Sequence, residues 1–238
     1  IKIITVEDPI EYSLEGVNQI QVNHQINLTF ATGLRSILRH DPDVILIGEI
    51  RDKETAAISI QSALTGHLVF STLHTNDAAS AFTRLMDMGI EDYLVSSSII
   101  GVLAQRLVRK LCKECREEYV PEPSVMARVY EQVSVDGDNQ IESKRKSGFQ
   151  SKDNLKLYRA KGCSVCGFSG YKGRMCISEF LLVDATIRDL INSHVDSTAI
   201  SRAAIKKGTR TLFRDGMDRT IAGLTTFDEL IRVTDTEE

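Results

Sequence analysis

Two pairs of reactive side chains stand in the first third of the chain, each directly after a short apolar run. Glu49 and Arg51 form the first pair, and Thr72 and His74 form the second. An apolar run of this length predicts a strand that is buried on both faces of a parallel sheet. Because ligands of such sheets bind beyond the carboxyl ends of the strands, we expect all four side chains near the rim of one nucleotide site.

The first pair suits phosphoryl chemistry. Hydrolysis of a phosphoanhydride needs a carboxylate near Mg²⁺ and the attacking water, and Glu49 at a strand end fits this role. Guanidinium groups neutralise the charge that builds on the transferred phosphoryl group. Arg51, Arg35 and Arg39 are candidates for this task. The alternative for the arginines is solvation or pairing with acids such as Asp41.

Further groups are candidates for the same rim. Glu7, Asp8 and Glu11 follow an expected strand, where acids can hold Mg²⁺ through water or orient the attacking water. The alternative is a solvated loop of ordinary acids. His74 can hydrogen-bond a γ-phosphate. Its alternative, a structural histidine, fits His67 better than His74.

The cysteines indicate a metal site. Cys112 and Cys115 form one C-x-x-C motif, and Cys163 and Cys166 form another. In a chain without an export signal, paired motifs favour a closed structural Zn²⁺ site over disulfides. A redox role is less favoured because neither motif opens a helix in a βαβ unit. Cys176 lies in an apolar strand pattern and is expected to be a buried free thiol.

Composition is that of an ordinary globular protein. The chain is 42% hydrophobic and 26% charged, with a net charge of -4, so no global field favours nucleic acid or an anionic membrane. No apolar run approaches the ~20 residues of a membrane span. The chain begins at Ile1, within an apparent strand and without a methionine, and we therefore expect it to be a fragment of a longer protein.

The elements that must position these groups alternate along the first half of the chain, which predicts an α/β sheet with right-handed crossovers. Strands are expected over 1–6, 17–22, 44–49 and 67–72. Helices are expected over 30–39, over 52–64 with Asp52 as cap, from Asn76 or Asp77 to Met88, and over most of 93–111. Beyond these lie a polar insertion at 120–154, a strand over 174–182 and three or four short helices over 184–233.

One absence bears on activity. The phosphate-gripping motif G-x-x-x-x-G-K-[ST] does not occur in the sequence. The glycines at 167, 170 and 173 lack its Gly-Lys-Ser/Thr end and open no helix, so they predict turns. We expect these residues alone to bind ATP weakly and to be inactive.

Several motifs carry a resemblance to a known family. Residues 4–11 resemble the Asp box of secretion ATPases, 45–52 their atypical Walker B motif with a glycine at 48, and 71–76 their His box; residues 101–109 and the cysteines also match. The chain thus resembles the secretion ATPase superfamily nearly end to end, and most closely its type II secretion assembly ATPases (the general secretion pathway protein E family).

The resemblance implies a partial RecA-like P-loop NTPase core over 1–111. A tetracysteine zinc subdomain over 112–176, with the insertion 120–154, and a C-terminal strand and helical subdomain over 177–238 follow it. It implies ATP with Mg²⁺ and structural Zn²⁺ as cofactors. Glu49 would be the catalytic carboxylate, supported by Glu7 and Glu11, with His74 sensing the γ-phosphate. The residues expected around the phosphates are Arg35, Arg39, Arg51, Arg84, Arg174 and Thr72.

The resemblance also implies a homo-hexameric motor at the cytoplasmic face of the bacterial inner membrane. It would associate peripherally with inner-membrane platform proteins and drive pseudopilus assembly and protein export. The near alternative is a type IV pilus assembly ATPase, whereas the retraction ATPase of pili lacks the four cysteines. A non-catalytic, zinc-stabilised assembly module is the alternative of another class. A nucleic-acid binder is the weakest, because the basic stretch 144–161 lacks interleaved aromatic residues.

Overall fold

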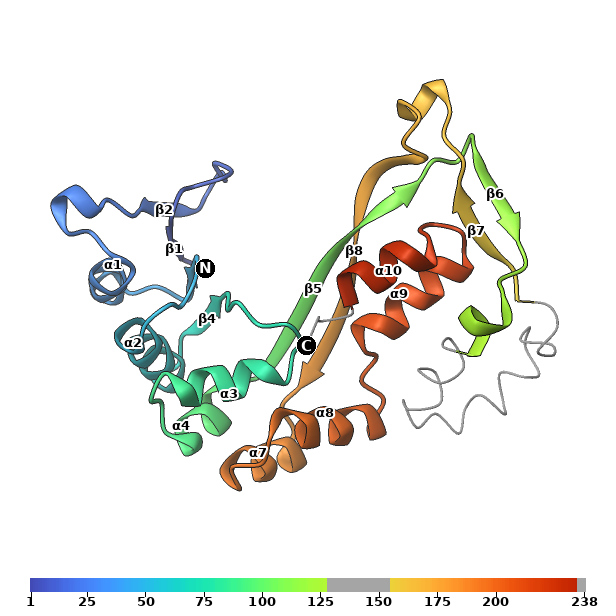
Figure 1. Cartoon of the computed structure of the whole chain (residues 1–238). Coiled ribbons are helices and arrows are strands. Elements are labelled where there is room, and N and C mark those ends of the chain that lie inside the picture. Colours follow the sequence, from blue (N-terminus) through green and yellow to red (C-terminus); the bar gives the residue numbers. More distant parts are fainter. Residues whose placement is uncertain (128–154, 235–238) are drawn as a thin grey trace. The chain divides into compact units, whose positions relative to one another are not determined.

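The computed structural model describes residues 1–127 and 155–234, which belong to two compact units (Figure 1). Unit 1 comprises Ile1–Thr75, Ala79–Val102 and Val183–Ile200. Unit 2 comprises Asn76–Ala78, Leu103–Leu182 and Ser201–Glu238. Most of the expected polar insertion, residues 128–154, lies outside the described residues.

Unit 1 is built on a four-stranded parallel sheet with the order β2-β1-β3-β4. The strands are β1 (Ile3–Glu7), β2 (Asn18–Gln21), β3 (Val44–Ile47) and β4 (Leu68–Ser71). Val6 of β1 is in register with Ile47 of β3, which is in register with Ser71 of β4. These three strands therefore end at one edge of the sheet, where the candidate site residues follow them.

Helices complete unit 1. They are α1 (Phe30–Ile37), α2 (Lys53–Leu64), α3 (Ser80–Asp87), α4 (Asp92–Ser98) and α7 (Ala185–Asn192). The sheet and α1 share a buried core, to which Leu34 and Ile37 of α1 contribute. Gly33 permits the close approach of this helix, because a Cβ atom there would lie 3.0 Å from Cγ2 of Val6.

The start of one helix agrees with its prediction and that of another does not. Asp52 caps α2, since its Oδ1 accepts a hydrogen bond of 2.8 Å from the backbone N–H of Thr55. In contrast, α3 begins at Ser80 with Ala79 at the N-cap. Both residues predicted as its cap belong instead to the segment Asn76–Ala78 of unit 2.

Unit 2 contains two two-stranded sheets, β5 with β8 and β6 with β7. Its elements are β5 (Gly101–Leu111), β6 (Arg116–Tyr119), β7 (Leu157–Ala160), β8 (Tyr171–Leu182), α9 (Leu212–Ile221) and α10 (Phe227–Thr234), with α8 (Ser197–Lys206) spanning the border. The 3₁₀ turns within residues 1–127 and 155–234 are η1 (His24–Ile26), η2 (Leu38–His40) and η4 (Ser164–Cys166). The predicted series of short helices after residue 184 is confirmed as α7 to α10.

The helix predicted over 93–111 was wrong for its second half. The helix α4 ends at Ser98, and β5 follows it and pairs with β8. The buried residues of β5 are Ala104, Val108 and Leu111, a spacing that imitates the apolar face of a helix. Pairing with a strand far along the sequence outweighs this local periodicity.

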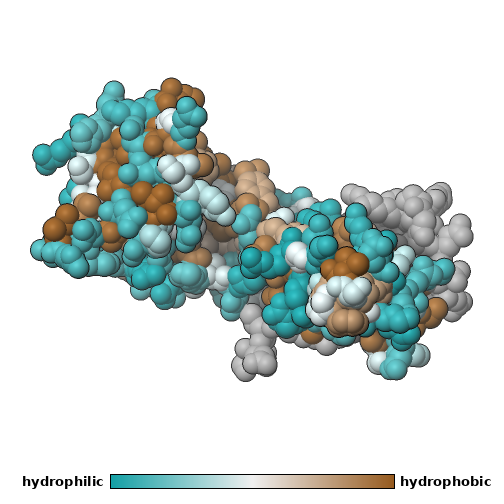
Figure 2. Space-filling view, turned by 90° about the horizontal axis from the view of Figure 1, so that it is seen from above, coloured by the Kyte–Doolittle hydropathy of each residue, from teal (hydrophilic) through white to brown (hydrophobic). Residues whose placement is uncertain are grey.

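The surface mixes hydrophilic and hydrophobic side chains (Figure 2). At the end of the sheet, β4 exposes Leu68 and Phe70 by 43% and 52%. Among the helices of residues 1–127 and 155–234, none combines the length and the apolar character that a membrane crossing requires.

Candidate nucleotide and metal sites

Hydrogen bonds join the strand ends of unit 1 into a fixed rim. The backbone N–H of Gly48 donates to the carbonyl of Val6 at 2.8 Å, and that of Ile50 donates to the carbonyl of Thr72 at 3.0 Å. The Thr72 hydroxyl donates to the carbonyl of Gly48 at 2.6 Å. The three strand ends are thus tied together through Gly48 and Ile50, the two chain neighbours of Glu49.

Glu49 is the centre of this rim. Its Oε2 accepts a hydrogen bond of 2.5 Å from Arg51 Nε and lies 3.2 Å from His74 Nε2. The Glu49 side chain is only 12% exposed, whereas that of His74 is 85% exposed. The hydrogen bond from Arg51 outweighs burial and lowers the pKa of Glu49 below its ordinary value. The carboxylate is therefore ionised at neutral pH, as a proton acceptor must be.

The structure separates the two acids predicted at the end of β1. Glu7 is half-buried, and its Oε1 accepts hydrogen bonds from Thr5 Oγ1 at 2.5 Å and from Gln19 Nε2 at 2.9 Å. Glu11 is exposed. Glu7 is therefore a positioned carboxylate at the sheet edge, while Glu11 lies in the loop that follows.

The predicted arginines differ in their partners. Arg51 pairs with Glu49, and Arg35 pairs with Glu54 of α2, an acid that was not among the alternative partners considered from sequence. Arg35 and Glu54 are both largely exposed, and such surface pairs contribute little stability. Arg35 can therefore turn to a phosphate at small cost. The remaining predicted arginines, all exposed, are Arg39 and Arg84 in unit 1 and Arg174 on β8 of unit 2.

Four thiols gather in unit 2. The Sγ atoms of Cys112, Cys115, Cys163 and Cys166 lie within 4.8 Å of one another, and three of the separations are 3.8–3.9 Å. Sulfurs that surround Zn²⁺ tetrahedrally at ~2.3 Å are about 3.8 Å apart, whereas a disulfide needs about 2.05 Å. The described thiols are all free. The four-thiol geometry fits a zinc ion.

Electrostatics within the cluster favour a cation. Burial opposes ionisation of Cys166, but backbone N–H groups of Cys163 and Gly170, each 3.2 Å from its Sγ, help lower the pKa of Cys166 to about 6. Burial raises the pKa of Cys115 to about 12. A bound cation would favour the thiolate forms that coordinate it.

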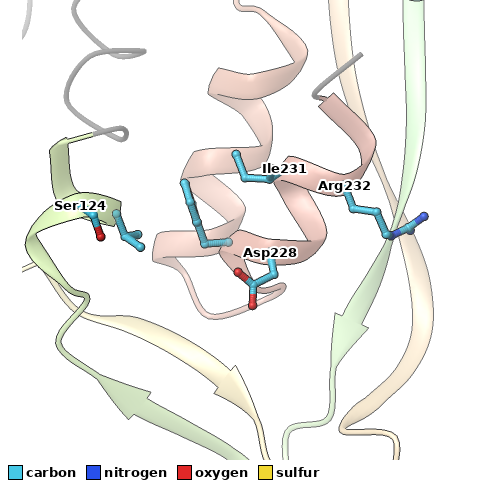
Figure 3. A pocket seen from close by; sticks show the side chains of 6 residues that line it. Ser124, Asp228, Ile231 and Arg232 are labelled. Atoms are coloured by element: carbon cyan, nitrogen blue, oxygen red, sulfur yellow. The ribbon is translucent and has the colours of Figure 1, made fainter. Parts of the chain in front are cut away.

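A separate pocket in unit 2 contains none of the predicted site residues. It encloses about 510 Å³. Ser124 lies on one side of it, and Asp228, Ile231 and Arg232 of α10 lie on the other (Figure 3). Arg232 is engaged by Glu229 at 2.7 Å, so the pocket offers no cluster of free cationic groups for a triphosphate.

Comparison with known proteins identifies the family. Residues 1–232 match the model of the family described as type II/IV secretion system protein. The chain belongs to this family. It is 49% identical to type II secretion system protein E of Dickeya dadantii, over 99% of this chain and 43% of that protein. It is 48% identical to type II secretion system ATPase E of Vibrio cholerae, over 98% of this chain and 42% of that protein.

Two further proteins to which the chain is similar are named for pili. The chain is 46% identical to the type IV pilus assembly ATPase PilB of Thermus thermophilus, over 95% of this chain and 24% of that protein. Among solved structures, the pilus retraction motor PilT with bound ADP has a TM-score of 0.65 at 26% identity, covering 99% of this chain and 53% of that one. The chain spans less than half the length of the three curated relatives, from Dickeya dadantii, Vibrio cholerae and Thermus thermophilus.

The ATPase DotB of Legionella pneumophila shares the fold, with a TM-score of 0.62 at 20% identity over 98% of this chain and 51% of that one. The predicted fold class, an α/β structure of the P-loop NTPase type with a parallel sheet, is confirmed. The predicted family is confirmed as well.

Sequence reasoning missed two residues that position Glu7 in this secretion-family chain. Thr5 and Gln19 are register partners on the adjacent strands β1 and β2, and both donate to the Glu7 carboxylate. A polar residue inside the apolar β1 is the signal in the sequence. The glycine of the Walker B-like motif, Gly48, lies where there is little room for a side chain, because a Cβ atom there would lie 3.3 Å from the ring of Phe30.

Proposed function

We propose that this chain carries the water-activating half of an ATP-hydrolysing motor that drives pseudopilus assembly and protein export in type II secretion. The observation that carries the proposal is the position of the Glu49 side chain, which contacts both Arg51 and His74 at the edge of a parallel sheet. The names of the relatives, which include secretion and pilus ATPases, support ATP as the substrate.

In the proposed reaction, water attacks the γ-phosphorus and its proton passes to Glu49, while ADP leaves with the electrons of the broken P–O bond. In the described structure Arg51 competes for the same carboxylate. The Arg51 side chain is 66% exposed, so it can turn to an arriving γ-phosphate. That exchange would give Arg51 a charge to neutralise and would raise the basicity of Glu49 when water must be deprotonated.

The other residues of the rim have supporting roles in this proposal. His74 would contact the γ-phosphate. Glu7 and Glu11 are the residues that would hold Mg²⁺ through water, and the bound ion would supply charge neutralisation at the phosphates. Thr72 holds the strand ends together and faces the phosphates. The phosphate contacts from the arginines are assigned to Arg35, Arg39, Arg51, Arg84 and Arg174, some of them across a subunit boundary.

Zinc would have a structural role, held by the four clustered cysteines. We further propose the functional division into a partial ATPase core at 1–111, a zinc subdomain at 112–176 and a C-terminal subdomain at 177–238. The whole protein would act as a homo-hexamer on platform proteins at the cytoplasmic face of the inner membrane. Assembly of type IV pili is the second candidate function, favoured by the 46% identity to PilB.

The full-length protein with Glu49→Gln tests the proposal. The amide cannot accept the proton of water, so we expect phosphate release to fall by about 100-fold or more while ATP binding persists. Glu91→Gln, which alters an exposed acid at the start of α4, is the matched control and should leave turnover unchanged. Undiminished phosphate release from Glu49→Gln would refute the assignment.

A further inference from the structure

His74 stands on a short bridge between two fixed points of the backbone. On one side, Thr72 is tied to the end of β3 through Gly48 and Ile50. On the other side, the segment Asn76–Ala78 belongs to unit 2. Only the residues 73–75 lie between these points. A bridge this short leaves the backbone at His74 little freedom that is independent of its two ends.

The fixed point in unit 2 is made by two charged side chains. Arg106 of β5 donates from Nη2 to the carbonyl of Asn76 at 3.3 Å and to its Oδ1 at 3.2 Å. Glu179 of β8 accepts from the backbone N–H of Ala78 through Oε1 at 3.3 Å and from that of Leu212 through Oε2 at 3.1 Å. Two strands of unit 2 thus hold the segment that directly follows the candidate phosphate sensor.

The anchor at Glu179 is difficult to displace. Glu179 is only 6% exposed, and Ala78 is fully buried. A buried carboxylate that loses its donors carries a large desolvation penalty. Leu212 is the first residue of α9, and a helix N-terminus favours negative charge. Glu179 therefore joins the segment 76–78 to the start of α9 as well as to β8.

We propose that Arg106 and Glu179 are positioning residues that hold His74 at the hydrolytic site through the segment Asn76–Ala78. The inference rests on the proposed ATP hydrolysis and extends it to residues outside the nucleotide rim. The backbone from Thr72 to Asn76 reaches at most about 14 Å when extended. Release of the segment 76–78 from Arg106 and Glu179 would therefore free the backbone beside His74 and loosen the contact of His74 with Glu49.

Amide hydrogen exchange on the full-length protein tests the anchor without reference to activity. In Arg106→Ala, the peptide that covers 73–78 should exchange about tenfold faster than in the parent protein, with α2 unchanged. The matched control is Gln105→Ala, which alters an exposed neighbour on the same strand. Exchange at 73–78 that is the same in Arg106→Ala as in the control would overturn the anchor.

A double-mutant cycle on ATP turnover tests the positioning role. Arg106→Ala should lower kcat by about tenfold with KM nearly unchanged, since it misplaces a group rather than removing a ground-state contact. If Arg106 acts through His74, the same change should have no further effect in a His74→Ala background. Additive losses in kcat would overturn the inference, because they mean that the two residues act independently.

A second variant guards against misfolding. Arg106→Lys keeps the charge but not the planar fork, and should restore part of the lost turnover. Failure of Arg106→Lys to improve on Arg106→Ala would argue against positioning by this hydrogen bond. If the parent protein itself releases no phosphate, the proposed function falls and the catalytic role of Arg106 falls with it. The exchange experiment separately decides whether the anchor exists.

Discussion

Arg51 donates its Nε–H to Glu49 Oε2 across 2.5 Å, from two residues further along the same loop. The two partners differ in freedom, because the Glu49 side chain is 12% exposed and that of Arg51 is 66% exposed. The acid is thus fixed by its surroundings, while the guanidinium is fixed chiefly by the acid. A site of this form can release its cation to a substrate without moving its base.

The Arg51–Glu49 bond predicts a shift in pH dependence. Arg51 lowers the pKa of Glu49, and the base works only when ionised, so activity should rise with pH through that pKa. In Arg51→Gln the pKa of Glu49 returns toward its ordinary value, and the acidic limb of kcat/KM should move to higher pH. Arg188→Gln, an exposed arginine of α7, should leave the limb in place. If the acidic limb of kcat/KM stays at the same pH in Arg51→Gln, the assignment of Glu49 as the base is contradicted.

The cysteine cluster predicts a bound metal. We expect about one zinc per chain in freshly purified protein, and Cys112→Ser should lose it with a lower thermal midpoint, because three thiolates close a structural site poorly. Elemental analysis measures the metal. Cys176→Ser is the matched control, since Cys176 lies outside the cluster. Zinc-free parent protein, or equal zinc loss in both variants, would refute the site.

A buried acid of α10 predicts a pH-dependent contribution to stability. Burial alone would raise the pKa of Glu229, but hydrogen bonds from Arg232 and Arg109 lower it to about 2. Arg109 also lies 4.1 Å from the ring centre of Tyr171. Because the folded pKa is below the ordinary value of 4.5, the stabilisation is complete above that pH and is lost as the pH falls toward 2.

Glu229→Gln should therefore destabilise the protein by about 2 kcal/mol at pH 7 and by less at pH 3. Urea unfolding of the variant and the parent protein at both pH values measures this difference. Glu118→Gln, which breaks an exposed pair with Lys156, should change the stability far less, because surface ion pairs contribute little. An equal loss for Glu229→Gln at both pH values would show that its charge is not responsible.

Gly48 predicts a steric effect at the rim. A Cβ atom there would lie 3.3 Å from Cε1 of Phe30 and 3.4 Å from the carbonyl of Val6. Gly48→Ala should cost about 1–2 kcal/mol and slow phosphate release, because it displaces the carbonyl that Thr72 holds. Phe30→Leu in the same chain should restore part of both losses by making room. No recovery in this double variant would remove the Phe30 contact as the cause.

Local patterns were sufficient for the central sheet. The apolar run of β3 and the cap at Asp52 depend on neighbours within four residues, so the sequence reveals them directly. The two C-x-x-C motifs also predicted that the four cysteines lie together, and the structure shows this cluster. In contrast, β5 depends on pairing with β8, and its local spacing imitates a helix. Strand pairing between distant segments has no comparable local signature.

Long-range polar partners were equally hidden. Arg109 and Glu229 are 120 residues apart, and Ala78 and Glu179 are 101 apart. The sequence predicted Arg35 as a phosphate ligand, with nearby acids as the alternative partners, but it did not reveal the pairing of Arg35 with Glu54 of α2. Side-chain partners follow from which elements lie together in space. The types of the site residues could therefore be predicted, while the groups that orient them could not.

The cysteine cluster also bears on how many residues unit 2 can accommodate between its two C-x-x-C motifs. Cys112 and Cys163 are 51 residues apart, yet their sulfurs lie 3.9 Å apart, so the cluster brings together two positions that are distant in sequence. The entropy of closing a loop grows only with the logarithm of its length, and doubling the length costs about 0.6 kcal/mol. The number of residues between the two motifs can therefore change at little cost to the free energy of bringing the cysteines together. The stretch between the two C-x-x-C motifs is therefore a place where insertions can accumulate without any change to the cysteine cluster.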